Sequence, residues 1–309
     1  MKDPFMQPEQ PESLPLLVCA LVVSHDCVEA VRRSVTALEA SHGRERMEIL
    51  VVDNGSRDGS QRMDSEFPDI NMLRLPHHCG LTKARNIGIR TAKAGFLLLL
   101  EAGVEVEPAT VMALVERLES DNSALAVCPL VVDSSGAAVS RMYPLPSASL
   151  VSSHWENPAS LAAIDDRAAG ELHDGKAILL RRHTIQGMNY LDEKFGEHWG
   201  DVEMAFQIKR AGKRIAMATD IKVHVDPAAA PLWRPASASD RAAYAADAAT
   251  GAAAYLGKHF GFGASLGFRI KLILGALLRT ITFQDFSYSS SLLSRLLSGY
   301  KIDGSSQRL

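Results

Sequence analysis

An acidic turn at residues 53–56, Asp-Asn-Gly-Ser, directly follows an apolar run that ends at Val52. A carboxylate at the end of a buried strand has no packing role, and it can accept hydrogen bonds from the base or the ribose of a nucleotide. Asp-Asn-Gly is equally typical of an Asx turn, in which the side chain only closes the loop. The turn by itself therefore leaves nucleotide binding and simple turn formation open.

A predicted strand-helix-strand unit positions this turn. Residues 16–23 form a continuous apolar run that is typical of a parallel strand buried on both faces. Apolar residues recur at helical spacing from Val28 to Leu38, and residues 48–52 supply a second buried strand. Because such crossovers are right-handed, the loops after both strands lie on one rim of the sheet, where open α/β sheets bind ligands.

Strands and helices continue to alternate along the chain, and a long, poorly periodic stretch at 133–170 predicts a loop region. Further strands are predicted at 71–75, 95–100, 124–132, 176–180, 214–218 and 221–225, and helices at 82–94, from Pro108 onwards, and at 201–211. After Pro227 the composition shifts towards alanine, and residues 238–260 are predicted to be helical. We therefore expect a disordered leader at 1–13, a main α/β domain at 14–228 and a helical extension at 229–309.

The bulk composition excludes some classes of protein. The 309 residues are 47% hydrophobic with a net charge of −3, which is ordinary for a globular protein and gives no reason to expect nucleic acid as a partner. The four cysteines are far apart and form no CxxC pair, which argues against a zinc site and a disulfide framework and fits a reducing cytoplasm. Arg269, Lys271 and Arg279 interrupt the most hydrophobic region, so we expect no membrane-spanning helix.

The C-terminal region predicts basic amphipathic helices. Apolar residues between Leu266 and Ile281 follow helical spacing, and a leucine-rich segment at 292–297 repeats the pattern. Between residues 258 and 301 there are six basic residues against one acidic residue, Asp285. Such a surface fits anionic lipid at the inner face of a membrane. Packing on the main domain or on a second subunit of a homodimer explains the pattern equally well.

Several segments, taken in their order and spacing, make the chain resemble the family 2 glycosyltransferases, with similarity to bacterial rhamnosyltransferase-like members. The resemblance extends over roughly residues 15–226. It is carried by Ser-His-Asp at 24–26 and by the segments 51–60, 80–88, 97–108, 175–182, 191–195, 200–203 and 210–212. It implies the GT-A fold, a mostly parallel central sheet flanked by helices, here followed by the C-terminal helical extension.

The resemblance also implies a nucleotide site. Asp53 is expected to bind the base, with Ser24 and Asp26 lining the same pocket near the ribose. Lys83 and Arg85 are expected to face the nucleotide, where the start of a helix adds partial positive charge. For an isolated pair of basic residues, a solvated helix face is the competing explanation.

The main departure from the family concerns the metal. Family members end the fourth strand with an Asp-x-Asp type motif whose last aspartate binds a divalent cation, Mg²⁺ or Mn²⁺, and the matching residues here are Glu101, Ala102 and Gly103. Glycine offers only a backbone carbonyl to a cation that prefers oxygen ligands, so Glu101 is left to contribute. Alternation along an extended segment would place Glu105 and Glu107 on the same face as residues 101 and 103. Their carboxylates can then either replace the missing metal ligand or remain solvated. His224 matches a position that can be a further metal ligand, whereas His77 and His78 receive no role.

The catalytic base is expected at Asp201, which matches the aspartate of the family's Glu-Asp motif, with Gly200 in place of the glutamate. Inverting transfer needs a base that deprotonates the acceptor hydroxyl. An aspartate at the start of the predicted 201–211 helix also serves as an N-cap, and both roles are compatible. Glu197 and Trp199 are expected in the acceptor site, Trp199 by stacking on a sugar face.

These features together predict an inverting glycosyltransferase that uses a UDP- or dTDP-linked sugar and a glycan or lipid-linked acceptor in polysaccharide biosynthesis. The rival hypothesis is a relative that kept the fold, lost turnover and binds nucleotides or glycans as a scaffold. The altered metal motif supports the rival. Retention of Asp53, Asp201, Asp192 and Glu193 supports activity. The residues of the site have to decide between the two hypotheses, because fold alone does not settle function.

Overall fold

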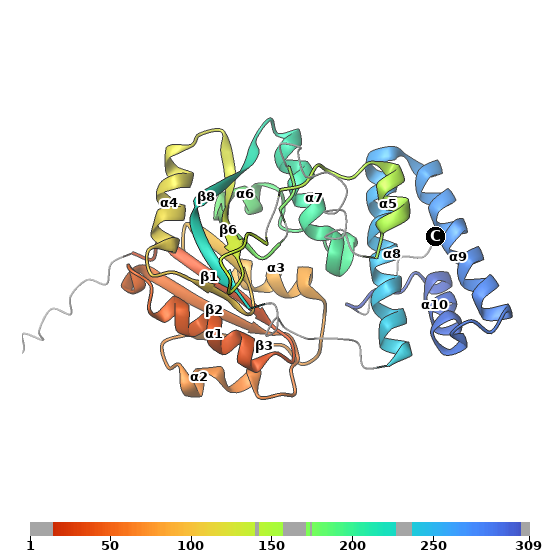
Figure 1. Ribbon diagram of the computed structural model, residues 1–309, viewed down its shortest axis with the longest axis horizontal. Helices are drawn as coiled ribbons and strands as arrows, with labels where there is room; N and C mark the ends of the chain where they lie inside the picture. Colours follow the sequence, from red (N-terminus) through yellow and green to blue (C-terminus); the bar gives the residue numbers. More distant parts are fainter. Residues whose placement is uncertain (1–14, 140–141, 157–170, 174, 227–236, 304–309) are drawn as a thin grey trace, which may run out of the picture.

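The computed structural model describes residues 15–139, 142–156, 171–173, 175–226 and 237–303 (Figure 1). Within these residues, eight strands form one sheet in the order β3-β2-β1-β4-β7-β6-β8-β5. The strands are β1 Val18–Ser24, β2 Met47–Asp53, β3 Asn71–Arg74, β4 Phe96–Glu101, β5 Val104–Val106, β6 Ala124–Val132, β7 Ala177–Arg181 and β8 Arg214–Val225. The helices before the C-terminal region are α1 Val28–Glu39, α2 Met63–Glu66, α3 Leu81–Thr91, α4 Thr110–Ser120, α5 Ala148–His154, α6 Arg182–Gly187 and α7 Gly196–Arg210. The predicted leader at 1–13 lies outside the described residues.

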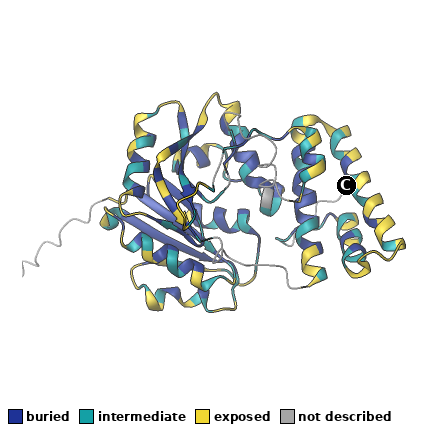
Figure 2. Ribbon diagram, in the orientation of Figure 1, coloured by how far each residue is buried: buried dark blue, intermediate teal, exposed yellow. Residues whose placement is uncertain are grey.

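The sheet separates two apolar layers, because successive side chains of a strand point to opposite faces. In β1, Val18, Ala20 and Val22 belong to the layer that includes α1 and α4. Cys19 and Leu21 belong to the opposite layer, which includes α3 and α7. β1 is therefore buried on both faces, as its unbroken apolar run predicts, and Figure 2 shows the central strands in the dark blue of buried residues.

The ends of several strands meet at one edge of the sheet. β1 pairs in parallel with β2 and with β4, and the register places Ser24 beside Asp53, while β4 ends at Glu101. Because β7 runs antiparallel to β4, Ala177 at the start of β7 lies at the same edge. This edge is called the carboxyl edge below. It holds the polar side chains that the sequence singles out after the buried strands.

The second half of the sheet differs in detail from its prediction. The two strands expected at 214–218 and 221–225 are a single strand, β8, which pairs in parallel with β6 through a register shift between Pro129 and Leu130. Proline has no N–H to donate to the ladder, which suits the irregular position. The region 133–170, expected to be loop, contains α5 in its described part.

Two local predictions are wrong. α7 begins at Gly196, before the predicted start at Asp201, so Asp201 lies inside the helix and is not its N-cap. The extended segment expected over residues 101–107 is interrupted, because β4 ends at Glu101 and Gly103 adopts a φ of 94° before β5 begins. A positive φ turns the chain, so the strand alternation does not carry from residue 101 to residues 105 and 107.

Three helices form the C-terminal region: α8 Ala238–Phe260, α9 Phe262–Ile281 and α10 Phe286–Ser298. α8 occupies the range that its alanine-rich composition predicts, and Ser237 and Asp240 form a capping box at its start. α8 lies against the main body, whereas α9 and α10 lie on its outer side (Figure 1). Within the described part of the chain, none of the helices combines the length and apolarity needed to cross a bilayer.

Candidate active site

Ser24 and Asp53 form the first part of the site, at the ends of β1 and β2. Both are buried, with 0% and 2% of their surface exposed, and the backbone N–H of Asn54 donates to the carbonyl of Ser24 over 2.8 Å. Asp53 Oδ1 accepts from the N–H of Ser56 over 3.3 Å. The Asx-turn hydrogen bond is therefore present, and it uses one of the several lone pairs of the carboxylate. Turn formation and ligand binding are thus compatible at Asp53.

Asp26 joins the loops that follow β1 and β2. Its φ of 48° is left-handed, its N–H donates to Ser56 Oγ over 3.0 Å, and its Oδ1 accepts from the N–H of Arg57 over 2.6 Å. Asp26 therefore stands beside the Asp53 turn, although 27 residues separate the two in sequence. At least one lone pair of the Asp26 carboxylate therefore accepts a hydrogen bond from the loop itself.

His78, to which the sequence gave no role, lies at the same edge. Its ring stacks on that of His25 with 4.0 Å between centroids, and its Nδ1 is 3.4 Å from the hydroxyl of Tyr244 in α8. Burial, with the neighbouring His25 second, lowers the pKa of His78 to about 4. The stacked rings of His25 and His78 therefore border the Asp53 turn, and the lowered pKa of His78 favours its uncharged form. The sequence gave no signal of this arrangement, because the partners of His78 come from the loop after β1 and from α8.

The N-terminus of α3 is held by α7. Glu197 Oε2 accepts from the N–H of Leu81 over 2.6 Å, and Thr82 Oγ1 donates to the carbonyl of Gly196 over 2.6 Å. A side chain at position 200 has no room here, because a Cβ on Gly200 would stand 2.7 Å from Thr82 Oγ1. Close approach of the two helices explains glycine where the family carries glutamate.

Arg85 and Asp201 form an ion pair between α3 and α7, in which the arginine is buried and the carboxylate is partly exposed. Arg85 Nη1 lies 2.9 and 3.1 Å from the two carboxylate oxygens of Asp201, and Arg85 is only 7% exposed. The guanidinium also reaches the carbonyl of Gly175 over 3.5 Å, and a Cβ on Gly175 would lie 3.0 Å from Asp201 Oδ2. Arg85 is thus neither a solvated helix residue nor a freely exposed cation. It fixes the direction of the Asp201 carboxylate.

Glu101 pairs with Lys176 at the carboxyl edge. The N–H of Glu101 donates to the carbonyl of Lys176 over 2.8 Å, and the Lys176 ammonium is 3.6 Å from Glu101 Oε2. Gly103 faces away into the structure, where its N–H donates to the buried Ser34 Oγ over 2.9 Å. The expected metal position therefore contains one carboxylate and one ammonium group.

The remaining candidates for metal ligands are not gathered around Glu101. His224 Nε2 lies 2.8 Å from Glu107 Oε1, and Glu105 pairs with Arg33 over 3.4 Å. Among the residues that the structure describes, no group of three or more His, Cys, Asp or Glu side chains is arranged to hold a metal ion. The pairing of Glu101 with His224 as metal ligands is therefore not supported by this arrangement.

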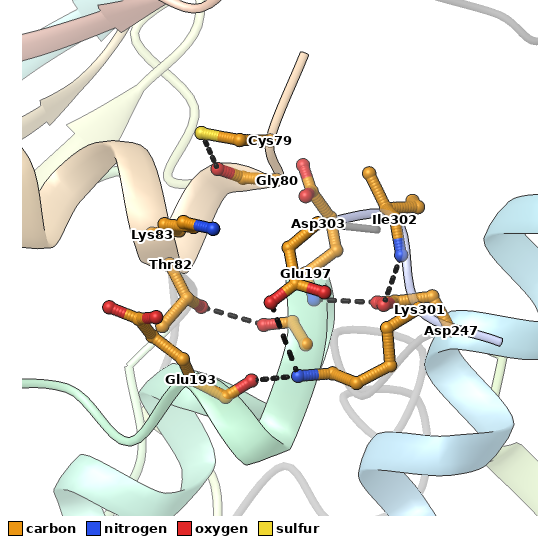
Figure 3. Close-up of a pocket in the computed structure, with 11 residues that line it drawn as sticks. Cys79, Gly80, Thr82, Lys83, Glu193, Glu197, Asp247, Lys301, Ile302 and Asp303 are labelled. Carbon is orange, nitrogen blue, oxygen red and sulfur yellow. Dashed lines mark hydrogen bonds and ion pairs between the residues drawn. The ribbon is translucent and has the colours of Figure 1, made fainter. Parts of the chain in front are cut away.

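Glu197 lines a small pocket with Lys83, close to the N-terminus of α3 (Figure 3). Its pKa is raised from the ordinary 4.5 to about 7, chiefly by burial; the Leu81 N–H acts in the opposite direction, and the charge of Asp247 adds to the increase. Asp247, on α8, accepts from the N–H of Glu197 over 2.7 Å and from the N–H of Ile302 over 3.0 Å. α8 therefore positions Glu197.

The chain after α10 returns to this pocket. Lys301 is buried, and its ammonium group donates to the carbonyl of Glu193. Lys301 Nζ also lies 3.7 Å from Asp303 Oδ2. Figure 3 shows residues 301–303 beside Glu197 and facing the start of α3. Sequence reasoning missed this segment, since a short polar stretch after the last helix carries no recognisable pattern.

Trp199 does not have the role expected for it. Its side chain is 0% exposed, its Nε1 donates to the carbonyl of Trp155 over 3.2 Å, and its ring packs against Tyr255 of α8. A ring enclosed in this way has no free face on which a sugar can stack. The stacking prediction for Trp199 is therefore wrong, because α8 covers the side of α7 that carries it.

The mostly parallel half of the sheet, with polar groups at its carboxyl edge, is typical of α/β proteins that bind nucleotides. The chain belongs to glycosyl transferase family 2, whose model matches residues 19–178, more than half of the chain. The resemblance to this family inferred from the sequence motifs is confirmed.

Two curated relatives match parts of the chain. Succinoglycan biosynthesis protein ExoO of Rhizobium meliloti (strain 1021) is 26% identical over 128 residues, covering 41% of this chain and 36% of that protein. The probable polypeptide N-acetylgalactosaminyltransferase 8 of Homo sapiens is 25% identical over 126 residues, covering 37% of this chain and 20% of that protein. The matches therefore span well under half of the length of these relatives.

Two solved structures have a similar fold. GalNAc-T7 with UDP, GalNAc and Mn²⁺ has a TM-score of 0.54 and 17% identity, covering 74% of this chain and 47% of that one. The mannosyltransferase PcManGT from Pyrobaculum calidifontis, in complex with GDP-Man and Mn²⁺, has a TM-score of 0.50 and 16% identity. The match covers 94% of this chain and 89% of that one. At these identities the similarity establishes the GT-A fold, and the predicted fold class is confirmed.

Proposed function

We propose that the chain is an inverting glycosyltransferase that moves a sugar from a UDP- or dTDP-linked donor to a hydroxyl group of a glycan or glycolipid. The observation that carries the proposal is the order of groups along the carboxyl edge. Asp53 and Ser24 end β2 and β1, and Glu101 ends the adjacent β4. Gly175, just before β7, accepts from Arg85, which also binds Asp201. A donor lying along this edge has its base at Asp53 and its sugar near the Asp201 carboxylate.

The nucleotide end of the proposed site consists of Asp53, Ser24 and Asp26. The buried carboxylate of Asp53 has acceptor capacity beyond its bond to Ser56 and binds the base, while the other two residues lie near the ribose. Lys83 in the first turn of α3 faces the diphosphate, where the helix N-terminus adds partial positive charge.

The catalytic end consists of Asp201 and its positioning residue, Arg85. Asp201 accepts the proton of the acceptor hydroxyl as the hydroxyl oxygen forms its bond to the anomeric carbon. The bond from that carbon to the diphosphate breaks on the opposite face, and its electron pair leaves with the nucleoside diphosphate. Arg85 contacts both carboxylate oxygens and so holds Asp201 in one orientation. Glu197 lies on the same face of α7, one turn earlier, and is proposed to border the acceptor.

The acceptor class is proposed to be a lipid-linked glycan at an anionic membrane surface, in polysaccharide biosynthesis. Phe262 and Phe283, at and beyond the two ends of α9, are 78% and 77% exposed, and an apolar stripe between them faces solvent. The stripe consists of Leu266, Ile270, Leu274, Leu277, Leu278 and Ile281. α9 carries Arg269, Lys271 and Arg279 and no acidic residue, a charge pattern that complements anionic lipid headgroups.

Flotation with vesicles that contain phosphatidylglycerol tests this partner. The full chain is expected to float, and Leu274→Glu/Leu278→Glu is expected to remain in the pellet fraction. Equal flotation of both proteins would remove α9 as the contact surface. A dimer in solution that the double variant dissociates, without flotation of the wild type, would assign the stripe to a second copy of the chain.

A non-catalytic relative is the second candidate, because Gly103 replaces the expected metal aspartate. Calorimetry with UDP, dTDP and GDP, followed by assays of donor hydrolysis, separates the two. The proposal predicts binding of at least one nucleoside diphosphate and slow hydrolysis of the matching sugar donor. Binding without hydrolysis or transfer would favour the non-catalytic relative, and absence of all nucleotide binding would exclude the transferase and leave only a glycan-binding or scaffolding role.

A further inference from the structure

The ammonium group of a lysine lies in the part of the carboxyl edge where the family is expected to place a divalent ion. Lys176 lies 3.6 Å from the Glu101 carboxylate, and both side chains keep access to solvent, with 29% and 40% exposed. The position that corresponds to the metal aspartate is Gly103, whose N–H is bonded to Ser34 inside the structure. The residues present therefore do not fit a divalent cation, which requires several oxygen ligands and would be repelled by the ammonium.

The position of Lys176 is fixed by the sheet. The β4–β7 pairing brings the carbonyl of Lys176 to the N–H of Glu101 over 2.8 Å, so the two side chains emerge together at the edge. Gly175, the preceding residue, contacts Arg85 and approaches Asp201. Lys176 thus stands between the end of β4 and the predicted base, where a donor diphosphate has to lie if its sugar is to reach Asp201.

The net charge of the Glu101–Lys176 pair equals that of the metal site expected for the family. An Asp-x-Asp type pair with a divalent cation has no net charge, and neither does Glu101 with Lys176. Ion pairs between partly exposed groups contribute little free energy, so the ammonium can turn from Glu101 to a phosphate at small cost. Arg85 is less suitable for this task, because it is buried and already binds both oxygens of Asp201.

We propose that Lys176 binds the donor diphosphate in place of a divalent cation, so that nucleotide binding and transfer proceed without metal. The inference rests on the proposed transferase function. Lys176 donates to phosphate oxygens in the ground state and stabilises the negative charge that develops on the diphosphate as its bond to the sugar breaks. Glu101 is then free to accept a hydrogen bond from a hydroxyl of the donor.

Calorimetry on the full chain treated with EDTA tests the proposal, using UDP, dTDP, GDP and uridine as probes. The nucleoside diphosphate that binds is expected to have the same affinity in EDTA and in excess Mn²⁺. Lys176→Met is expected to weaken that binding about 10- to 100-fold, the loss of one charge-assisted contact. Any binding of uridine, which lacks phosphates, is expected to be unaffected, and Lys176→Arg to restore most of the diphosphate affinity.

Lys209→Met is the matched control, because Lys209 forms a comparable ion pair with Glu171 on the outer surface of α7. It is expected to leave all affinities unchanged, and thermal unfolding verifies that both methionine variants fold. Binding that EDTA abolishes and Mn²⁺ restores would overturn the role of Lys176 and leave the transferase proposal intact. Failure of every nucleoside diphosphate to bind, with or without Mn²⁺, would instead reject the transferase proposal itself.

Discussion

The two ends of the candidate site are built in different ways. The nucleotide end is local to two adjacent parallel strands, and Ser24 and Asp53 meet because the β1–β2 register pairs them. The catalytic end depends on contacts between distant segments: Arg85 and Asp201 are 116 residues apart, and Glu197 is positioned by α8. The strand register therefore sets the relative positions of Ser24 and Asp53, whereas the packing of α3, α7 and α8 sets the geometry of the groups proposed for catalysis.

Asp201→Asn is expected to give the largest effect and to confine it to the catalytic end. The amide keeps an acceptor oxygen for Arg85 but cannot take a proton, so kcat should fall about 10²- to 10⁴-fold. Calorimetry should find nucleotide affinity little changed. Asp220→Asn, which alters another aspartate paired with an arginine, Arg117, is the control. Full activity of the Asp201 variant would remove this residue as the base.

Asp53→Asn is expected to affect the nucleotide end alone. The amide can maintain the turn with Ser56, but it is a weaker acceptor than a carboxylate, so affinity for UDP and for uridine should fall about 10- to 100-fold together. This pattern differs from that of Lys176→Met, which spares uridine. Asp133→Asn alters a comparable turn with Ser135 at the surface and serves as control. Unchanged uridine binding would show that Asp53 serves only the turn.

Gly200→Ala tests the close packing of α3 on α7. The added Cβ would meet Thr82 Oγ1 at 2.7 Å, and the free energy of unfolding should fall by about 1–3 kcal/mol in urea titrations. Thr82→Ala in the same chain should recover part of the loss. Gly187→Ala, where no atom lies within 4 Å of the new Cβ, is the control. A stable Gly200→Ala protein would mean that the two helices can separate without cost.

Glu197→Gln is expected to give the smallest effect, visible only in its pH dependence. The folded pKa of about 7 exceeds the ordinary 4.5, so the folded state binds the extra proton and the wild type loses stability as pH rises from 4.5 to 7. Glutamine resembles the protonated form. The two proteins should therefore be equally stable below pH 4.5, and the variant more stable by about 1–2 kcal/mol above pH 7, since the half-buried side chain retains some solvent. Parallel stability curves over this range would contradict the raised pKa.

Much of the fold could be predicted from sequence because its signals are local. The apolar run in β1 and the alanine-rich composition of α8 are properties of contiguous residues, and both elements occur where they were expected. The start of α7 was not predicted because two of its first five residues, Gly196 and Gly200, are glycines, which disfavour helix. Its N-terminus is satisfied instead by Asp247, which accepts from the N–H of Glu197 and comes from another helix.

Part of the candidate site could also be predicted, because some of its residues follow local sequence signals. Asp53 and Ser24 end strands whose pairing follows from their patterns, so their meeting was predictable. The enclosure of Trp199 was not, because α8 covers it from outside the main sheet. The return of residues 301–303 to the start of α3 likewise involves α8, because Asp247 on that helix accepts from the N–H of Ile302.

By itself, the sequence determined the family and the parallel half of the sheet, because each is written in consecutive residues, and it predicted that Gly103 stands at the position of the metal aspartate. Only the tertiary structure decided which group lies beside Glu101. Lys176 lies 75 residues from Glu101 along the chain and reaches it through antiparallel pairing of β7 with β4. Charge neutralisation depends on distance in space, and a sequence pattern fixes that distance only after the strands have paired.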